Sequence, residues 1–263
     1  MENNDKGRFP DFMIIGAMKA GTTSLHNYLN QHPDIFMSQK KEIHYYADDY
    51  PDGYKKNPVQ WYKDQFKTDT KLAGTSPQSY TKCHNKYYQN IPERVYKDSP
   101  DIKLIYIVRD PIERYRSHIL ESYHCDPPHD VRYNIKSDHY LKTSMYYMQI
   151  SAWLEFFKKD QIYVLSLESL EEHKADEMNK LFTFLNVKEL NDASLFDFRS
   201  NLSADKTYPF VVRNNILVRA VRKLSSNLSY TVANILAVLF YKKQLKKPDL
   251  SEAKINELKE QLF

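Results

Sequence analysis

The chain has 263 residues, of which 41% are hydrophobic and 27% are charged, as is usual for a soluble protein with a substantial core. Its formal net charge of +4 at pH 7 suits an anionic ligand but does not require nucleic acid, so we expect no nucleic-acid partner. We expect a single domain over residues 1–263, with a flexible N-terminus over residues 1–10 and a helical C-terminal extension over residues 210–263.

The two cysteines, Cys83 and Cys125, imply no disulfide framework, and a reducing cytoplasm is the default compartment for such a chain. The first residues, MENNDKGRFPDF, contain no apolar signal core. The longest apolar run, residues 230–241, is too short to span a bilayer. These features predict a cytoplasmic protein with no membrane partner. The apolar C-terminal segment leaves a homo-oligomer open.

The first predicted unit is a strand, a loop and a helix. Residues 12–15 form a short apolar run that reads as a buried strand, and residues 22–31 have helical spacing that ends at His32 and Pro33. Such a unit directs backbone N–H groups and the positive end of the helix dipole toward one point. An ordinary turn between a strand and a helix would show the same sequence pattern. However, two of only five glycines bound this loop, which favours close approach of the backbone to a ligand.

The loop itself, within the stretch IIGAMKAGTTS of residues 14–24, differs from the phosphate loop of ATPases. That loop reads G-x-x-x-x-G-K-[ST], with lysine directly after the second glycine. Gly16 and Gly21 keep this spacing, but Thr22 occupies the lysine position and Lys19 lies inside the loop. The displaced lysine predicts an anion other than the β- and γ-phosphates of ATP.

Further strands are predicted at residues 35–37, 71–74, 102–108 and 161–167. Residues 102–108 are nearly continuous in apolar side chains, as in a central parallel strand. Helices are predicted at residues 112–123, 144–157 and 168–185. Strands that alternate with helices indicate an α/β, P-loop-like fold in three layers, with a central parallel sheet flanked by helices.

A second anchor for a ligand follows the central strand. Asp110 and Pro111 suit the N-cap and first position of a helix, but they do not explain Arg109. Arg109 lies at the carboxyl end of a buried strand, the edge at which open α/β sheets bind ligands. A guanidinium there can offer a bidentate fork to a phosphate, and Ser117, two turns into the helix, adds a hydroxyl.

Two kinase-like alternatives fit this stretch less well. Asp110 imitates the magnesium-holding aspartate of a P-loop ATPase, but Lys19 is then misplaced. A protein kinase catalytic loop reads H-R-D-L-x-x-x-N, whereas this chain has Val108 in place of the histidine and Tyr115 in place of the asparagine.

With both anchors in view, the chain resembles the PAPS-dependent sulfotransferases, where PAPS is 3′-phosphoadenosine 5′-phosphosulfate. The loop of that family that binds the 5′-phosphosulfate carries a lysine followed by G-T-T/S, as residues 19–24 do here. Its 3′-phosphate element is an arginine at a strand end and a serine eight residues later, as are Arg109 and Ser117. The resemblance covers about residues 11–210. It implies an enzyme that releases PAP (3′-phosphoadenosine 5′-phosphate) and needs no metal.

Within the family the chain most resembles the carbohydrate branch that includes the heparan sulfate O-sulfotransferases. Residues 40–46 resemble its K-E-x-H-F-F segment, residues 61–66 its W-Y-x-x-x-F, and residues 203–209 the late loop that closes over the donor. Residues 74–80 resemble its G-E-K-[TS]-P-x-Y, although the Glu-Lys pair is absent, as are the paired cysteines that some members carry.

The resemblance implies a role for each matching residue. Lys19 reaches the bridging oxygen of the donor, Glu42 is the catalytic base, and His44 is a reserve base. Without the resemblance, Glu42 reads as a solvent-facing charge and His44 as a packed histidine. The residues implied to bind the donor are Lys19, Ala20, Gly21, Thr22, Thr23, Ser24, Arg109, Ser117, Lys206 and Tyr208. Those implied to contact the acceptor are Lys41, Tyr45, Ser76 and Tyr80.

The predicted reaction is transfer of a sulfuryl group from PAPS to a hydroxyl of a carbohydrate or a small-molecule natural product. N-sulfation of an amine or carbamoyl group, a P-loop nucleotide kinase and an inactive PAP-binding scaffold stay open as alternatives. His124, Cys125 and His129 lie in a proline-rich loop without a fourth ligand, so we expect no metal site there.

Overall fold

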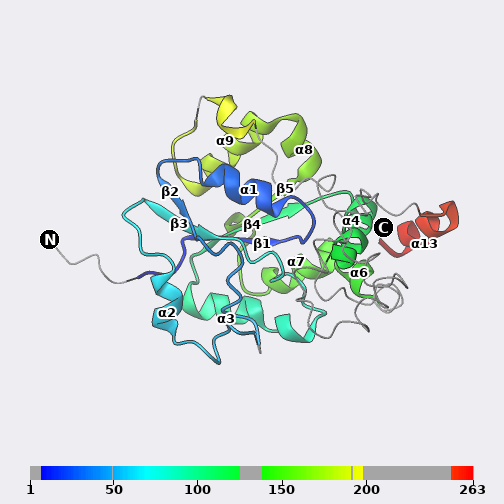
Figure 1. Cartoon of the computed structure of the whole chain (residues 1–263), viewed down its shortest axis with the longest axis horizontal. Coiled ribbons are helices and arrows are strands. Elements are labelled where there is room, and N and C mark those ends of the chain that lie inside the picture. Colours follow the sequence, from blue (N-terminus) through cyan, green and yellow to red (C-terminus); the bar gives the residue numbers. More distant parts are fainter. Residues whose placement is uncertain (1–6, 49, 125–137, 191, 198–249, 263) are drawn as a thin grey trace, which may run out of the picture.

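The computed structural model describes residues 7–48, 50–124, 138–190, 192–197 and 250–262. Its centre is one five-stranded sheet in the order β2-β3-β1-β4-β5, and every neighbouring pair of strands is parallel (Figure 1). The strands are β1 (Phe12–Gly16), β2 (Ile35–Met37), β3 (Leu72–Thr75), β4 (Lys103–Val108) and β5 (Ile162–Ser166). The predicted α/β fold with a parallel sheet is confirmed.

Helices join the strands and cover both faces of the sheet (Figure 1). They are α1 (Thr22–Leu29), α2 (Val59–Asp64), α3 (Ile91–Asp98), α4 (Pro111–His124), α6 (His139–Lys142), α7 (Tyr146–Leu154), α8 (Leu167–Glu172), α9 (Lys174–Leu185) and α13 (Glu252–Leu262). Single 3-10 turns lie at η1 (Lys86–Tyr88), η2 (Lys159–Gln161) and η3 (Ala193–Phe196).

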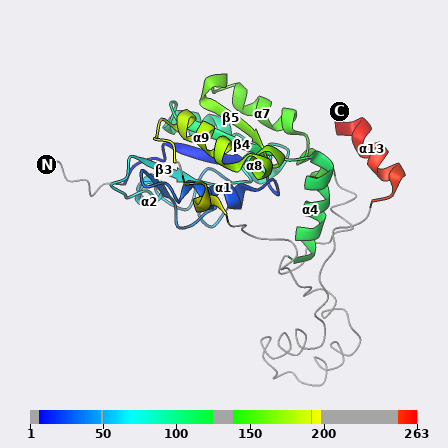
Figure 2. The same ribbon diagram turned by 90° about the horizontal axis from the view of Figure 1, so that it is seen from above.

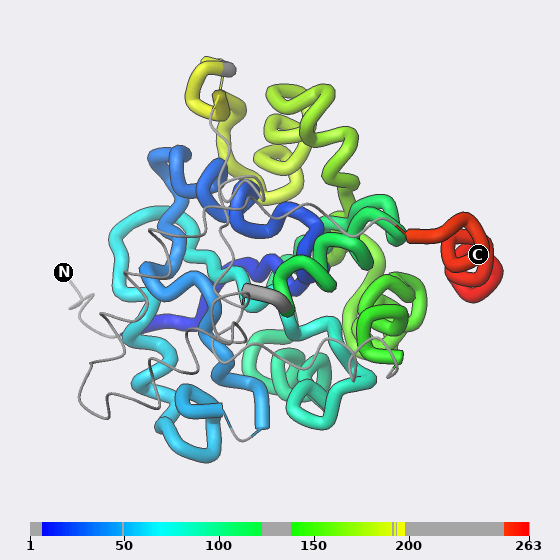
Figure 3. Tube along the Cα trace, turned by 45° about the vertical axis from the view of Figure 1, so that its right-hand side comes forward, coloured from blue at the N-terminus to red at the C-terminus, as the bar shows by residue number. Residues whose placement is uncertain are grey.

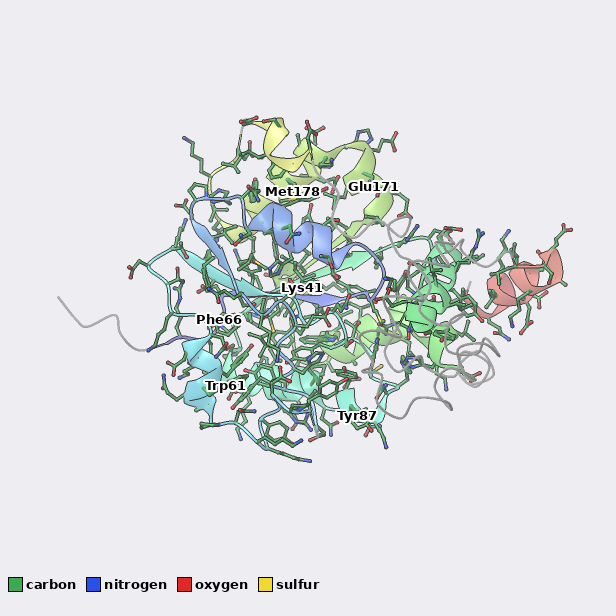
Figure 4. The ribbon with its side chains drawn as sticks, viewed as in Figure 1. Lys41, Trp61, Phe66, Tyr87, Glu171 and Met178 are labelled. Carbon is green, nitrogen blue, oxygen red and sulfur yellow. The ribbon has the colours of Figure 1, made fainter. Side chains whose placement is uncertain are left out.

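The alternation of side chains along the central strands builds two cores, one on each face of the sheet. In β1, Met13 and Ile15 pack with α2, α3 and α7, whereas Phe12 and Ile14 pack with α1, α8 and α9. Figure 4 shows the resulting layers: Lys41 lies between the labelled side chains of Glu171 and Met178 on one side and those of Trp61, Phe66 and Tyr87 on the other.

A third, smaller cluster lies at one end of the molecule. There α13 packs through Leu258 on Tyr115 and Ile119 of α4 and on Tyr140 of α6, and α13 and α4 lie side by side in Figures 2 and 3. The described end of the predicted helical extension is therefore a helix. Most of that extension, residues 210–249, lies outside the described residues.

Two predicted helices differ from the structure. The helix expected at residues 168–185 is divided at His173, whose backbone leaves the helical region (φ −125°, ψ 48°), so α8 and α9 are separate. The first of them begins early because the Ser166 hydroxyl at the end of β5 caps it by accepting the Ser169 N–H. The helix expected at residues 144–157 is shorter and runs only over Tyr146–Leu154.

Residues 7–10, within the N-terminus that was predicted to be flexible, contact the rest of the domain. Phe9 packs against Tyr62 with ring centroids 6.2 Å apart, and Arg8 Nη2 donates to the Thr70 carbonyl at 3.0 Å. These contacts hold the segment on α2. None of the helices that the structure describes is long and apolar enough to cross a membrane.

Candidate active site

The sequence-predicted anchors meet at the carboxyl edge of the sheet. β1 ends at Gly16, β3 at Thr75 and β4 at Val108, and the residues with predicted roles follow each of these ends directly. The loop after β1 is tied to the neighbouring strand, because the Ala17 N–H donates to the Ile107 carbonyl at 2.7 Å. Ligands of open α/β sheets bind at this edge.

The glycine-bounded loop places the first turn of α1 beside this edge. Gly21 is the N-cap of α1 with φ 96°, in the left-handed region that glycine tolerates best. A Cβ at this position would lie 2.6 Å from Leu167 Cδ1, so space also favours glycine. The backbone N–H groups of the first turn, which includes Thr22, Thr23 and Ser24, have no partner within a helix and together attract anions.

Lys19 has φ 68° and turns its side chain toward α4. Its Nζ lies 3.0 Å from Glu121 Oε2, and 18% of the Lys19 side chain is exposed. Glu121 is one helical turn beyond Ser117, so both lie on the same face of α4. The structure thus brings Lys19 and Ser117 to one side of the loop. Glu121 was not predicted, because only the fold reveals its contact with Lys19.

Arg109 has an unsatisfied donor at the same edge. Its buried Nε has no hydrogen-bond partner, and its Nη2 lies 3.7 Å from Glu113 Oε2. The Tyr146 hydroxyl holds the backbone by donating to the Arg109 carbonyl at 2.8 Å. Asp110 caps α4 as predicted, since its Oδ1 accepts the Glu113 N–H at 2.8 Å. A buried guanidinium N–H without a partner fits an anionic ligand, and Ser117, two turns into α4, is also buried.

Glu42 is linked to the loop through Gln78. The Gln78 Nε2 donates to Glu42 Oε1 at 2.5 Å, and the Thr22 hydroxyl donates to Gln78 Oε1 at 3.0 Å. Lys41 Nζ donates to the same Glu42 oxygen at 3.1 Å. Three segments that lie far apart in the sequence are therefore linked by one series of side-chain hydrogen bonds. Gln78 was not predicted, although it lies within the G-E-K-[TS]-P-x-Y-like stretch.

His44 lies next to Glu42 and is packed on most sides. Its Nε2 is 3.9 Å from Glu42 Oε2, and its ring stacks on Tyr50 with centroids 4.4 Å apart. Burial lowers the pKa of the His44 imidazole, and the nearby carboxylates of Asp52 and Glu42 offset only part of this effect. The ring is therefore neutral at neutral pH and can accept a proton.

Ser76 holds loops together. It is fully buried, its N–H donates to the Lys41 carbonyl at 3.1 Å, and its hydroxyl shares a hydrogen bond of 2.8 Å with His26 Nδ1. Burial, with a further contribution from Lys41, lowers the pKa of His26 to about 4. Ser76 thus fixes the segments that carry Lys41 and Gln78, and its buried hydroxyl is not on the surface of the site.

Two tyrosines predicted to contact the acceptor lie in the core instead. Tyr45 stacks on Tyr62 with ring centroids 4.4 Å apart. The Tyr80 hydroxyl donates to the Ile43 carbonyl at 2.9 Å and accepts the Tyr46 N–H at 3.0 Å, so its single O–H is used within the core. These contacts correct the prediction, because both side chains pack in the core rather than on the surface of the site. Two predicted donor-binding residues, Lys206 and Tyr208, lie outside the described residues, as do Cys125 and His129.

No motif pointed to Arg114, which is fully buried behind the loop. Its guanidinium donates to the Ser144 hydroxyl at 2.6 Å, to the Tyr140 carbonyl at 2.6 Å and to the Met18 carbonyl at 3.5 Å. A fourth contact, at 3.2 Å, joins it to His118 Nδ1. Burial lowers the pKa of Arg114 to about 10, so it is charged at neutral pH. Arg114 thus fastens the glycine-bounded loop to α4 and α6.

Within the described part of the chain, no group of three or more histidine, cysteine, aspartate or glutamate side chains is arranged to hold a metal ion. The donor groups of the site are cationic or backbone N–H, and they fit a phosphate or sulfate better than a cation.

Comparison with known proteins gives one consistent family. The model of the sulfotransferase domain matches residues 9–226. Heparan sulfate glucosamine 3-O-sulfotransferase 5 of Mus musculus and of Homo sapiens is 29% identical over 198 residues, which are 68% of this chain and 54% of the relative. The membrane-associated sulfotransferase kil1 of Dictyostelium discoideum is 36% identical over 118 residues, 44% of this chain and 22% of its own length. The chain thus spans about half the length of the two 3-O-sulfotransferases that it matches.

Solved structures show the same fold. A sulfotransferase from Alicyclobacillus acidocaldarius superposes with a TM-score of 0.59 at 22% identity, covering 86% of this chain and 96% of that one. A mouse sulfotransferase, SULT7A1, in complex with PAP superposes with a TM-score of 0.51 at 16% identity, covering 72% of this chain and 62% of that one.

Proposed function

The chain belongs to the sulfotransferase domain family, and on this premise we propose that it transfers a sulfuryl group from PAPS to a hydroxyl of an acceptor and releases PAP. The observation that carries the proposal is the link between the two halves of the site. Thr22 of the glycine-bounded loop, Gln78 and Glu42 form one hydrogen-bonded series, so an anion site and a carboxylate base are held side by side.

The residues of this chain divide the binding of the donor between two anchors. The N–H groups around Ala20 to Thr23 and the Lys19 ammonium hold the 5′ end, while Arg109 and Ser117 hold the 3′-phosphate. The buried, unpartnered Nε of Arg109 supports the second assignment. PAPS supplies the activated sulfuryl group. Because it has no β- and γ-phosphate pair to hold, the proposal includes no metal ion.

Lys19 and Glu42 have complementary tasks in the transfer. Lys19 leaves Glu121 for the donor and stabilises the charge that develops on the leaving phosphate, as preorganised cations do in phosphoryl transfer. Glu42 accepts the proton of the acceptor hydroxyl on Oε2, the oxygen that neither Lys41 nor Gln78 occupies. His44, which is 3.9 Å from that oxygen, is the reserve base.

For the acceptor we propose a saccharide hydroxyl, supported by the heparan sulfate 3-O-sulfotransferases among the relatives. A small-molecule natural product is a second acceptor class, and N-sulfation of an amine or carbamoyl group is the alternative reaction. Localisation in the cytoplasm and self-association stay predictions from the sequence.

Titration calorimetry tests the donor assignment without knowledge of the acceptor. We expect PAP to bind with a dissociation constant in or below the micromolar range, and ATP with magnesium not to bind. Arg109→Ala should weaken PAP binding by about 10- to 100-fold, the loss expected for one or two charge-assisted hydrogen bonds. Arg116→Ala, on the helix that follows Arg109, is the matched control because Arg116 is paired with Glu113. Binding of ATP with magnesium in place of PAP would point to a nucleotide kinase and overturn the proposal.

The acceptor class is tested with radiolabelled PAPS. Purified chain is incubated with desulfated glycosaminoglycan fragments, simple sugars, and aromatic and aliphatic alcohols and amines. Label on a saccharide hydroxyl supports the proposal in full. Label on amines alone would show that the reaction is N-sulfation rather than the proposed O-sulfation. PAP binding without label on any acceptor would favour the alternative of an inactive PAP-binding scaffold.

A further inference from the structure

Gln78 connects the donor half of the site to the acceptor half, and its amide orientation can be assigned from chemistry. A carboxylate only accepts hydrogen bonds, so the NH₂ group must face Glu42, which lies at 2.5 Å. The amide oxygen then faces Thr22 at 3.0 Å, and the Thr22 hydroxyl must be the donor. The whole series therefore has one direction, from Thr22 through Gln78 to Glu42.

The two oxygens of Glu42 are not equivalent. Oε1 accepts from both Gln78 Nε2 and Lys41 Nζ, at 2.5 and 3.1 Å. Oε2 lies 3.9 Å from His44 Nε2, which is beyond hydrogen-bond distance. Because 30% of the Glu42 side chain is exposed and the described residues show no hydrogen bond to Oε2, we assign Oε2 to the acceptor.

The backbone beneath Gln78 is fixed independently of any ligand. The Gln78 N–H donates to the Ser76 carbonyl at 2.8 Å, and the Ser76 N–H donates to the Lys41 carbonyl at 3.1 Å. The Ser76 hydroxyl is in turn bound to His26 of α1. Gln78 thus projects from a segment fastened both to the loop that carries Glu42 and to the helix that follows the donor loop.

We propose that Gln78 is a positioning residue that sets Glu42 relative to the donor loop, so that Oε2 faces the acceptor hydroxyl in line with the sulfuryl group. Gln78 does not touch the reacting atoms. It acts by holding Oε1, while Thr22 fixes the distance from the amide to the loop. This inference rests on the proposed sulfuryl transfer. It predicts that a residue without catalytic chemistry controls turnover rather than donor binding.

Three variants separate the two hydrogen bonds of Gln78. Gln78→Met keeps the length of the side chain and removes both bonds. Gln78→Glu keeps an oxygen for Thr22 but offers Glu42 no donor and places a second carboxylate beside it. Thr22→Val removes the hydroxyl that holds the amide. Gln60→Met, at an exposed glutamine of α2 that donates to Asp64, is the matched control for Gln78→Met. For each protein we would measure kcat at saturating PAPS, the KM of the acceptor, the dissociation constant of PAP and the Tm.

We expect Gln78→Met to lower kcat by about 10- to 100-fold, because misplacement by about an ångström has effects of that size. Its PAP dissociation constant should stay within about two-fold of wild type and its Tm within about 2 °C, since a half-exposed polar side chain away from the core changes little in stability. Gln78→Glu should lose at least as much turnover. Gln60→Met should keep the kcat of wild type. Thr22→Val should lower kcat, and the Thr22→Val, Gln78→Met double variant should fall no further than Gln78→Met, since both act through one series.

The outcomes are distinguishable. A kcat of Gln78→Met within two-fold of wild type overturns the inference while the proposed function stands. A parallel loss of Tm, PAP affinity and kcat shows a merely structural role and overturns it too. If the kcat losses of Thr22→Val and Gln78→Met multiply in the double variant, the two residues act independently, and the proposed connection through Thr22 is overturned. Wild-type protein that neither binds PAP nor transfers label overturns the proposed function and the inference with it.

Discussion

The proposed donor half and the proposed acceptor half of the site are built in different ways. The donor half comes from two short stretches of chain, and its main binding groups are backbone N–H groups placed by the loop geometry of Lys19 and Gly21. The acceptor half is assembled from loops after β2 and β3, and side-chain hydrogen bonds of Lys41 and Gln78 hold its base. The fold itself therefore fixes the donor half, whereas a few half-exposed side chains fix the acceptor half.

This contrast teaches that binding and turnover should be separable by mutation. A change in the donor half removes both, because the anion is no longer held. A change in the acceptor half leaves the anion in place and removes only the geometry of proton transfer. Each of the following experiments either sharpens that separation or breaks it.

The largest effect is expected from Glu42→Gln. The amide keeps the shape of the side chain but cannot take the proton of the acceptor, and general-base catalysis contributes about 10²–10⁴ in rate. We expect kcat to fall by about that factor while the dissociation constant of PAP, measured by calorimetry, stays unchanged. Glu93→Gln, on the exposed surface of α3, is the control. Full turnover in Glu42→Gln would move the role of base to His44.

Lys19→Ala should affect both quantities. Loss of one preorganised charge at the leaving group costs about 10²–10³ in kcat, and the 5′ end of the donor also loses a partner. We expect slower label transfer together with weaker PAP binding, and Lys67→Ala, an exposed lysine outside the site, should change neither. Slower transfer with unaltered PAP affinity would break the contrast between the two halves, because Lys19 would then act in the transition state alone.

A smaller effect on stability is expected in acid. Burial holds the pKa of His26 at about 4 in the folded protein, below its ordinary value of 6.5, so the unfolded chain binds the extra proton first. Stability is therefore full above about pH 6.5 and is lost as the pH falls toward 4, by on the order of 2–3 kcal/mol for this residue. Burial lowers the pKa of His84 and His118 as well, so each of these two residues also makes the folded protein less stable as the pH falls.

Thermal melts between pH 8 and pH 4 check this expectation. The Tm of wild type should decline below about pH 6.5, and His26→Asn should decline less over the same interval. His173→Asn is the control because that side chain is 57% exposed. An equal decline in wild type and His26→Asn would show that His26 is not the group responsible.

Local patterns in the sequence were enough to predict the sheet, the glycine-bounded loop and the strand end at Arg109, because each depends on residues close together in the chain. Gln78, Glu121 and Arg114 were not predictable in this way, since each acts through a contact between segments that only the fold brings together. Alternation of apolar and polar residues also did not reveal that Tyr80 is turned inward, because its hydroxyl finds backbone partners within the core.

The neutral surroundings of Arg114 have a consequence for the empty and the loaded protein. Every partner that the structure shows for this guanidinium is uncharged: a hydroxyl, an imidazole and two carbonyls, one of them belonging to the glycine-bounded loop. A cation enclosed in this way creates a positive potential at this end of the molecule in the absence of a ligand. We therefore expect the proposed bisphosphate donor, when bound, to stabilise the end of the molecule at which α4, α6 and the glycine-bounded loop meet.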